Sequence, residues 1–319
     1  MSVPPGVPPL PRIEPTVTNP EHDPFDGRVV VGMDGSDAST RAAHWAVQEA
    51  RSRGLGLTLA HAVIPVVSGG AFAVGIPPRL DLIEQMRVGA VTELTRLAAE
   101  LDSPDVQVVV EIGTPSGLLL TASDTAALLV LGSRGRGGFA DLLLGSVGTQ
   151  VASHASCPVV VMRDEARTDA QNVVVGIDGS PHSVAALEFA FAIASRRGWN
   201  VVAVHAWDVP SYDLIVSPDG PVPIPLENVA DDEVRLAAEM LSGFSEDYPD
   251  VTITESLIRS PAVQALLEAS TNAALIVVGT RGRNAALGAL LGSVSNGVLH
   301  KAHVPVAVVP LPEPELEAA

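Results

Sequence analysis

Two glycine-spaced loops carry the residues best suited to bind phosphate. The first loop contains Gly132, Gly135, Gly145 and Ser146, with two and then nine residues between successive glycines. A second loop repeats this spacing at Gly279, Gly282, Gly292 and Ser293. Glycine lets the backbone turn with positive φ and lets an anion approach without a Cβ in the way. The repeated spacing therefore predicts two binding sites for the phosphates of a nucleotide.

The elements around these loops favour the same chemistry. Each loop follows an apolar strand, so we expect it at the carboxyl edge of a parallel sheet, where open α/β folds bind ligands. Residues 145–147 and 292–294 should open helices, whose N-terminal amides attract phosphate oxygens. The candidate phosphate-binding residues are Gly132, Ser133, Arg134, Gly135, Arg136, Gly137, Gly138, Gly145, Ser146 and Val147 in the first half, and Gly279, Thr280, Arg281, Gly282, Arg283, Gly292, Ser293 and Val294 in the second.

The charge available to these loops comes from arginine. The chain has a single lysine, Lys301, which excludes a phosphate loop that ends in Gly-Lys-Ser/Thr. The loop arginines either contact phosphate directly or point to solvent, and the sequence leaves both readings open.

Two aspartates lie in matching turns after the predicted first strand of each half. Asp34 and Asp178 each stand in a Gly-x-Asp-Gly-Ser segment, which brings a carboxylate to the same edge of the sheet. The carboxylates could meet ribose hydroxyls or a phosphate-bound metal, or could only shape the turn. Their polar neighbours could likewise shape the turn and cap the following helix, and for the serines among them we favour capping. These neighbours are Ser36, Asp37, Ser180 and Ser183.

The remaining reactive side chains do not form a catalytic set. His61 and His205 repeat at the ends of matching strands, and without a second ligand at metal-site spacing we interpret them as structural. His300 and His303 lack the spacing of a helical zinc site and are interpreted as surface or interface residues. Cys157 lies among small and apolar residues, which is typical of a packed thiol. We therefore expect no catalytic residue and leave metal ligands unassigned.

An internal repeat defines the domain organisation. VVVGMDGS at 29–36 returns 144 residues later as VVVGIDGS at 173–180, a period typical of duplicated domains rather than a solenoid. We expect a disordered proline-rich extension at 1–26, a first domain at 27–163, a polar linker at 164–171, a second domain at 172–310 and an acidic tail at 311–319.

The pattern within each half predicts an α/β fold. In the first half, strands are expected near 28–33, 56–62, 106–112, 127–132 and 158–162, with helices between them. The strands are almost continuously apolar, which favours a parallel sheet covered on both faces. Val184, Leu187, Phe191 and Ala194, and less strongly Ala43, Val47 and Ala50, repeat at helical spacing and should face that sheet.

Composition excludes several function classes. A net charge of −18 and a pI near 4.7 argue against binding to nucleic acid, which rewards clustered basic residues. Residues 54–78 carry no ionised side chain, but their prolines and paired glycines predict a strand and a loop rather than a membrane span. The start of the chain lacks a secretory signal pattern, and with one cysteine this favours the cytoplasm.

These residues resemble the tandem, ATP-binding branch of the universal stress protein family, from about Arg28 to Val309. The family signature Gly-x2-Gly-x9-Gly-Ser/Thr occurs twice, as does the aspartate of the first turn. The resemblance implies two Rossmann-like (adenine nucleotide alpha hydrolase-like) domains, each a five-stranded parallel sheet flanked by helices. It also implies that Asp34 and Asp178 lie near the nucleoside and that the final strands, 158–162 and 305–309, pair the two halves. Adenine would meet the backbone at Ala62 and Ala206, above Gly32 and Gly176.

The function implied is an ATP-binding stress or growth regulator, with Mg²⁺ accompanying ATP, an intrachain pseudo-dimer, a further homodimer and a protein partner that the sequence does not identify. The alternatives are slow ATP hydrolysis, an adenylate-handling enzyme or a ligand-free interaction scaffold. One departure from the first loop is Asn284-Ala285 in place of Gly137-Gly138, from which we expect weaker binding at the second site.

Overall fold

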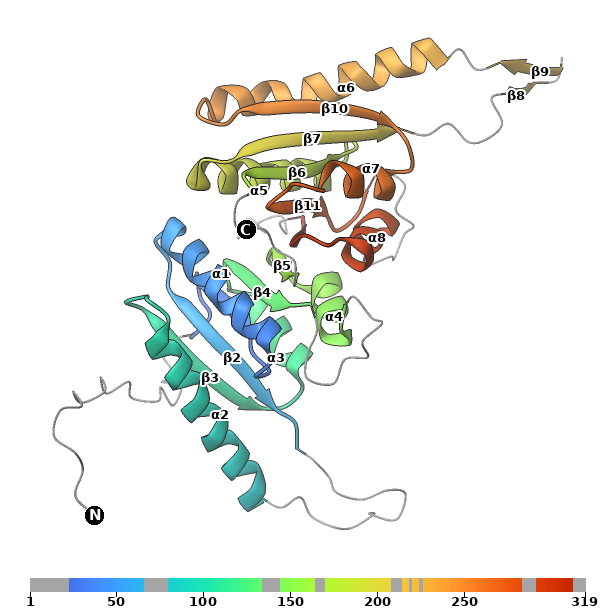
Figure 1. Ribbon diagram of the computed structural model, residues 1–319. Helices are drawn as coiled ribbons and strands as arrows, with labels where there is room; N and C mark the ends of the chain where they lie inside the picture. The colour runs from blue at the N-terminus through green and yellow to red at the C-terminus, as the bar shows by residue number, and fades with distance from the viewer. Residues whose placement is uncertain are drawn as a thin grey trace, which may run out of the picture.

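The protein consists of two similar α/β halves that share one sheet (Figure 1). The computed structural model describes residues 23–65, 80–133, 144–163, 170–207, 214–217, 220–223, 226–282 and 291–311. The first half contains β1 (Val29–Gly32), α1 (Asp37–Arg53), β2 (Leu57–Val63), α2 (Leu80–Glu100), β3 (Val106–Ile112), α3 (Pro115–Ser123), β4 (Leu128–Gly132), α4 (Ser146–His154) and β5 (Val159–Met162). The second contains β6 (Asn172–Ile177), α5 (Pro181–Arg197), β7 (Asn200–Trp207), β8 (Leu214–Ser217), β9 (Gly220–Pro223), α6 (Leu226–Asp247), β10 (Ile253–Arg259), α7 (Ala262–Ala269), β11 (Leu275–Gly279), α8 (Ser293–Lys301) and β12 (Val306–Val309).

Each half has the five-stranded parallel sheet expected from its apolar strands. The first half has the order β3-β2-β1-β4-β5, and the second repeats it as β10-β7-β6-β11-β12. All neighbouring strands within these two five-stranded orders are parallel. The prediction of two duplicated α/β domains is therefore confirmed.

The two halves join through their last strands. β5 and β12 pair in the antiparallel direction, with Val306 opposite Val161, Ala307 opposite Val160 and Val308 opposite Val159. This seam makes one ten-stranded sheet of the described strands. It confirms that the final strand of each half joins the domains.

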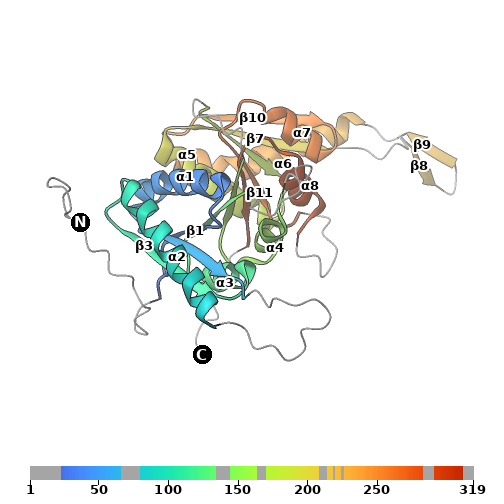
Figure 2. The ribbon, with the colours of Figure 1, turned by 60° about the horizontal axis from the view of Figure 1, so that its bottom comes forward.

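Helices cover both faces of the shared sheet, and each face has its own core. One core contains buried residues of α1, α2, α5 and α6, and the other contains buried residues of α3, α4, α7 and α8. Both cores run across the seam into the two halves. In both ribbon views α1 lies near α5, and α4 lies near α8 (Figures 1 and 2). The halves are thus related by an approximate two-fold rotation.

The first helix of each half shows why the repeat folds alike. Ser36 and Ser180 cap the two helices, since each hydroxyl accepts from the N–H three residues later at 3.2 Å. The helices end at Gly54 and Gly198, whose φ angles of 67° and 64° suit glycine. Capping was the expected role of these serines. Val184 was expected to face the sheet, and this prediction is wrong, because the residue is 37% exposed.

Three parts of the chain differ from the sequence expectations or lie outside them. The hairpin β8–β9 was not predicted, although Ser-Pro-Asp-Gly at 217–220 is a turn signature. Phe25, within the expected extension, is 5% exposed and packs in the core of the first half. Residues 1–22, 164–169 and 312–319 of the predicted extension, linker and tail lie outside the described residues.

No helix of the described chain has both the length and the apolarity to cross a membrane.

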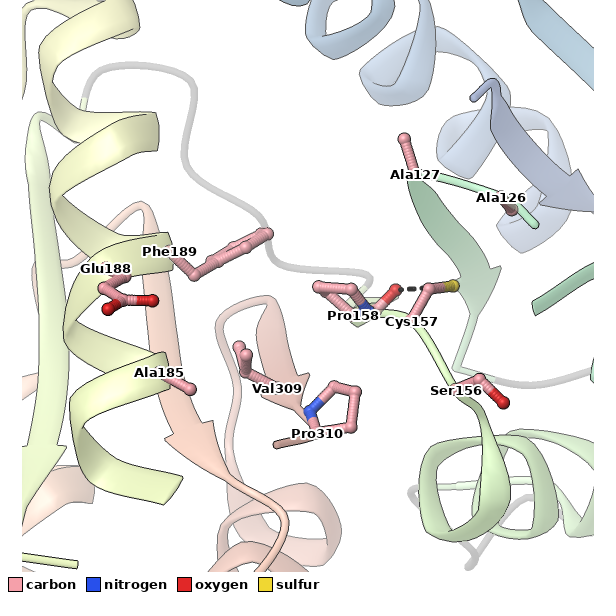
Figure 3. Close-up of a pocket in the computed structure, with 10 residues that line it drawn as sticks. All are labelled: Ala126, Ala127, Ser156, Cys157, Pro158, Ala185, Glu188, Phe189, Val309 and Pro310. Atoms are coloured by element: carbon pink, nitrogen blue, oxygen red, sulfur yellow. Dashed lines mark hydrogen bonds between the residues drawn. The ribbon is translucent and has the colours of Figure 1, made fainter. Parts of the chain in front are cut away.

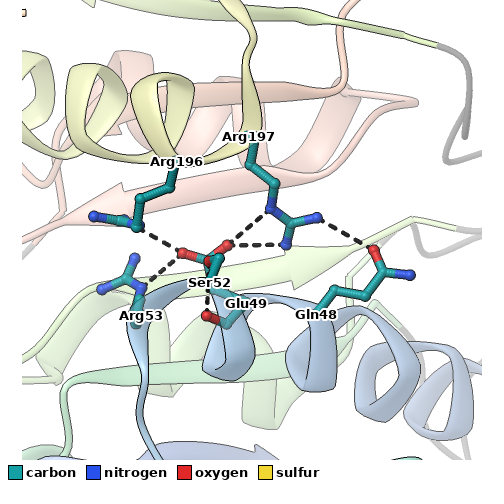
Figure 4. Close-up of polar contacts among 6 residues, drawn as sticks. All are labelled: Gln48, Glu49, Ser52, Arg53, Arg196 and Arg197. Atoms are coloured by element: carbon teal, nitrogen blue, oxygen red, sulfur yellow. Dashed lines mark hydrogen bonds and ion pairs between the residues drawn. The ribbon is translucent and has the colours of Figure 1, made fainter.

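A buried carboxylate links the two halves on the α1/α5 face (Figure 4). Glu49 of α1 is 0% exposed and pairs with three guanidinium groups. Its carboxylate accepts from Arg53 at 2.6 Å, from Arg197 at 2.9 and 3.2 Å, and from Arg196 at 3.4 Å. Two of these arginines come from α5 and are 147 and 148 positions from Glu49 in the sequence. The carboxylate therefore bridges the two halves.

Aromatic rings surround this cluster with a reciprocal pattern. Arg53 of the first half lies over Phe189 of the second, at 5.3 Å from the ring centroid. Arg197 of the second half lies over Trp45 of the first, also at 5.3 Å. These four positions are equivalent in the repeat, and such exchange is typical of a two-fold interface.

Loss of the Glu49 charge should weaken the whole protein. The substitution Glu49→Gln keeps the side-chain volume but leaves three guanidinium groups without a buried counter-charge, so we expect the free energy of unfolding to fall by about 3 kcal/mol. Urea unfolding followed by circular dichroism measures this change. The control is Glu100→Gln, which removes an exposed partner of Arg96 and should leave the midpoint unchanged. Equal midpoints for Glu49→Gln and the wild type would contradict the bridging role.

The same carboxylate should determine part of the acid sensitivity. Burial raises the pKa of Glu49, but the charges and hydrogen bonds of Arg53 and Arg197 outweigh burial and hold that pKa below its usual 4.5. The ion pair therefore stabilises the fold fully above about pH 4.5, and the stabilisation is lost as pH falls through the lower, folded-state pKa. Thermal midpoints of the wild type and Glu49→Gln should converge between about pH 5 and about pH 3. A constant difference over this range would argue against it.

Candidate functional site

The candidate site of each half lies where the strand order reverses. β1 lies between β2 and β4, and the chain builds the sheet outward from it in both directions. Asp34 follows β1, and Gly132 ends the neighbouring β4. In the second half, Asp178 follows β6 and Gly279 ends β11. Both sets lie at the carboxyl ends of their strands, which is the position predicted for them and the usual ligand crevice of such sheets.

The aspartates shape their turns. Oδ1 of Asp34 accepts from the Ser36 N–H at 3.0 Å and from its hydroxyl at 2.6 Å. Oδ1 of Asp178 accepts from the Ser180 N–H at 3.0 Å. The glycine in each turn has a positive φ, 75° at Gly35 and 80° at Gly179. The turn-shaping role is therefore present in both halves.

The second aspartate also faces the second glycine-spaced loop. Its Oδ2 would lie 2.5 Å from a Cβ placed on Gly282. The carboxylate of Asp178 and the second glycine of the loop are thus neighbours, although they are 104 positions apart in the sequence. A side chain at Gly282 would require this carboxylate to shift.

Two helices begin at the candidate sites without a side-chain cap on their first turns. α4 begins after Gly145 and α8 after Gly292, and neither N-cap glycine offers a side chain to the first turn. The N–H groups of Gly145 and Gly292 themselves donate to Ser133 and Thr280 carbonyls, at 2.9 and 2.7 Å, and so close the loops. The first amides of each helix, at 146–147 and 293–294, have no acceptor inside the helix. They are the groups available to a phosphate.

The glycines of the site divide into two groups by their surroundings. A Cβ on Gly132 would lie 2.9 Å from the backbone of Ala38, and one on Gly279 would lie 2.6 Å from the His182 carbonyl oxygen. Gly32 and Gly176 similarly face leucine side chains, at 2.7 and 3.2 Å. A Cβ on Gly145, in contrast, meets only the Ser133 carbonyl at 3.8 Å. Packing accounts for the first group, whereas the fold has room for a side chain at Gly145.

The backbone at Ala62 and Ala206 lies beyond the end of a strand pairing. The β1–β2 register ends at Gly32 opposite Ala60, whereas β2 continues to Val63. The β6–β7 register ends at Ile177 opposite His205, and β7 continues to Trp207. Ala62 and Ala206 thus lie just beyond the pairing with the strand that leads into each aspartate turn.

The remaining polar residues have structural partners. Nδ1 of His61 donates to the Met33 carbonyl at 2.7 Å, and Nδ1 of His205 donates to the Ile177 carbonyl at 2.9 Å. The structural interpretation of both histidines is confirmed. Cys157 is buried, and burial raises the pKa of its thiol to about 12, so the thiol is not a nucleophile. Among the described residues, no three His, Cys, Asp or Glu side chains form a metal-holding group.

Part of the predicted site is outside the described chain. The residues concerned are Arg134, Gly135, Arg136, Gly137, Gly138 and Arg283, together with Asn284 and Ala285 of the departure noted above. Arg281 is described and exposed. The structure adds His182, which sequence analysis missed and which the repeat aligns with Ala38.

A hollow of about 330 Å³ opens elsewhere, between the two halves (Figure 3). It is lined by Cys157 and Pro158 at the start of β5 and by Phe189 and Pro310 of the second half. These first-half residues are at the amino end of their strand. The hollow is therefore separate from the candidate site of the first half, whereas Val309, which also lines it, pairs with Gly279 of the second.

The glycines with packing roles should be intolerant of alanine. Gly132→Ala places a Cβ against the Ala38 backbone, and we expect a loss of about 1–3 kcal/mol in the free energy of unfolding. Gly89→Ala is the matched control, because Gly89 lies in α2 with nothing within 4 Å, and it should raise stability by up to about 1 kcal/mol. Urea unfolding of both variants tests the contrast. Equal stabilities would show that the strand end can shift to accept a side chain.

Comparisons with known proteins agree with this architecture. The model of the universal stress protein family matches residues 27–163 and 170–310. Two universal stress proteins of Mycobacterium tuberculosis are similar to this chain: one is 36% identical over 309 residues, covering 89% of the chain and 95% of the relative, and the other is 38% identical over 291 residues, covering 88% and 96%. A solved universal stress protein structure from Archaeoglobus fulgidus shares the fold, with a TM-score of 0.62, 21% identity, and coverage of 90% of this chain and 97% of that one. The chain belongs to the universal stress protein family.

Proposed function

We propose that this protein is a nucleotide-dependent stress regulator that binds one ATP in each half. The observation that carries the proposal is the uncapped start of α4 and α8, each at a strand-order reversal and each preceded by a glycine. Helix amides without an internal acceptor, at the carboxyl edge of a parallel sheet, are suited to phosphate oxygens.

The rest of the crevice suits a nucleoside. In this proposal the phosphates lie at the amides of 146–147 and 293–294, and the ribose faces Asp34 or Asp178. The base lies against the backbone of Ala62 or Ala206, where pairing with the first strand of the half has ended. Mg²⁺ would be carried by the phosphates of ATP, since carboxylates of the described chain do not gather around a metal position.

A regulator fits the polar groups at the site better than an enzyme does. Asp34 is engaged by Ser36, and His61 is engaged by the Met33 carbonyl, so neither stands as a base beside a nucleophile. Occupancy of the site, rather than turnover, would then carry the signal. A further homodimer, a cytoplasmic location and slow hydrolysis of ATP stay predictions.

Calorimetry with ATP and Mg²⁺ tests the proposal on the full chain. We expect two sites in the wild type, one in Gly145→Leu, one in Gly292→Leu and none in the double variant, because the leucines cover the helix amides. Gly243→Leu is the matched control: Gly243 is exposed on α6 with nothing within 4 Å, and both sites should remain.

The possible outcomes separate three functions. Absence of binding by the folded wild type would contradict the proposal and favour a ligand-free interaction scaffold. Binding followed by rapid release of phosphate, measured by a coupled assay, would instead indicate an enzyme. Circular dichroism of each leucine variant distinguishes a blocked site from an unfolded domain.

A further inference from the structure

The two candidate sites differ at one position next to the phosphate loop. Ala38 is the second residue of α1 and His182 is the second residue of α5, and the repeat aligns them. Ala38 packs against Gly132, where its backbone carbon lies 2.9 Å from the position of a glycine Cβ. His182 packs against Gly279 in the same way, with its own Cβ 2.8 Å from that position. At this aligned position, a titratable side chain therefore stands beside Gly279, and a methyl group stands beside Gly132.

His182 lies among the charged groups of the second site. Partial burial, and then the positive charge of Arg281, lower the pKa of His182 from its usual 6.5, while Asp178 acts in the opposite direction. Within the described chain, these are the charged groups that act on the ring. Asp178 comes from the turn after β6, and Arg281 from the loop after β11. The same aspartate borders Gly282, so the ring, the carboxylate and the loop form one cluster.

The consequence for an anion is direct. Binding of a negatively charged phosphate beside a neutral imidazole raises the proton affinity of that imidazole, because an opposite charge favours the protonated form. Resting on the proposed function, we propose that the second site takes up a proton from solution on the imidazole of His182 when it binds ATP, whereas the first site, with Ala38, does not. Nucleotide binding in the second half is thereby tied to pH, and the two sites report different conditions.

Calorimetry on single-site variants tests this inference. Gly145→Leu leaves the second site and Gly292→Leu leaves the first, and each is titrated with MgATP at neutral pH in two buffers of different ionisation enthalpy. We expect a buffer-dependent heat from Gly145→Leu that exceeds the one from Gly292→Leu. The first site serves as the matched control, because protonation of ATP itself contributes to both. The affinity of the second site should also rise relative to the first as pH falls from about 8 to about 6, by at most about tenfold per pH unit.

Exchange of the two residues identifies the proton acceptor. His182→Ala in the Gly145→Leu chain should reduce the buffer dependence to that of the first site, with ATP still bound. Ala38→His in the Gly292→Leu chain should create it at the first site. Equal buffer dependence for both sites, or its persistence after His182→Ala, would overturn this inference while leaving ATP binding intact. If the unsubstituted chain binds no ATP, the proposed function fails as well.

Discussion

The antiparallel pairing of β5 with β12 is the constraint on which the arrangement of the molecule depends. Three residue pairs join two parallel sheets into one, and both cores continue across that seam. The pairing brings α1 against α5 on one face and α4 near α8 on the other (Figures 1 and 2). Edge strands that would otherwise expose unpaired backbone groups are thereby satisfied within one chain. A half on its own would leave its last strand as an unpaired edge.

Within each half, a second constraint links the sheet to the site. The turn after the first strand must bring an aspartate to the crevice and also start a long helix, so one serine caps the helix and bonds the aspartate in the first half. The end of the fourth strand must pass close to that same helix, which leaves no space for a Cβ at Gly132 or Gly279. Glycine at the strand end thus has a packing reason in both halves, whereas at the helix start a Cβ on Gly145 would meet no close neighbour. Spacing alone does not distinguish these two cases.

Sequence reasoning predicted most of what depends on local pattern. Apolar runs predicted the strands of the first half to within about one or two residues at their ends, and the repeat predicted that the second half would copy them. The described site residues lie at the expected edge of the sheet. The Glu49 cluster was not predicted, because it depends on how two helices from different halves meet. Val184 faces solvent although its spacing suits the buried face. The place of His182 beside the second loop depends on its packing against Gly279, which is almost 100 positions away in the sequence and leaves no local pattern.

The Glu49 cluster has a consequence for the symmetry of the two halves. Arg53 matches Arg197 in the repeat and Trp45 matches Phe189, but the repeat aligns Arg196 with Ser52 and Glu49 with Ile193. Two identical subunits related by a two-fold axis would place two carboxylates, or two isoleucines, in this buried space. Neither arrangement gives the single anion that the arginines now share. One chain that carries both halves permits this unequal arrangement. The halves are therefore not interchangeable, and a symmetric homodimer of either half would lack this contact with a single carboxylate.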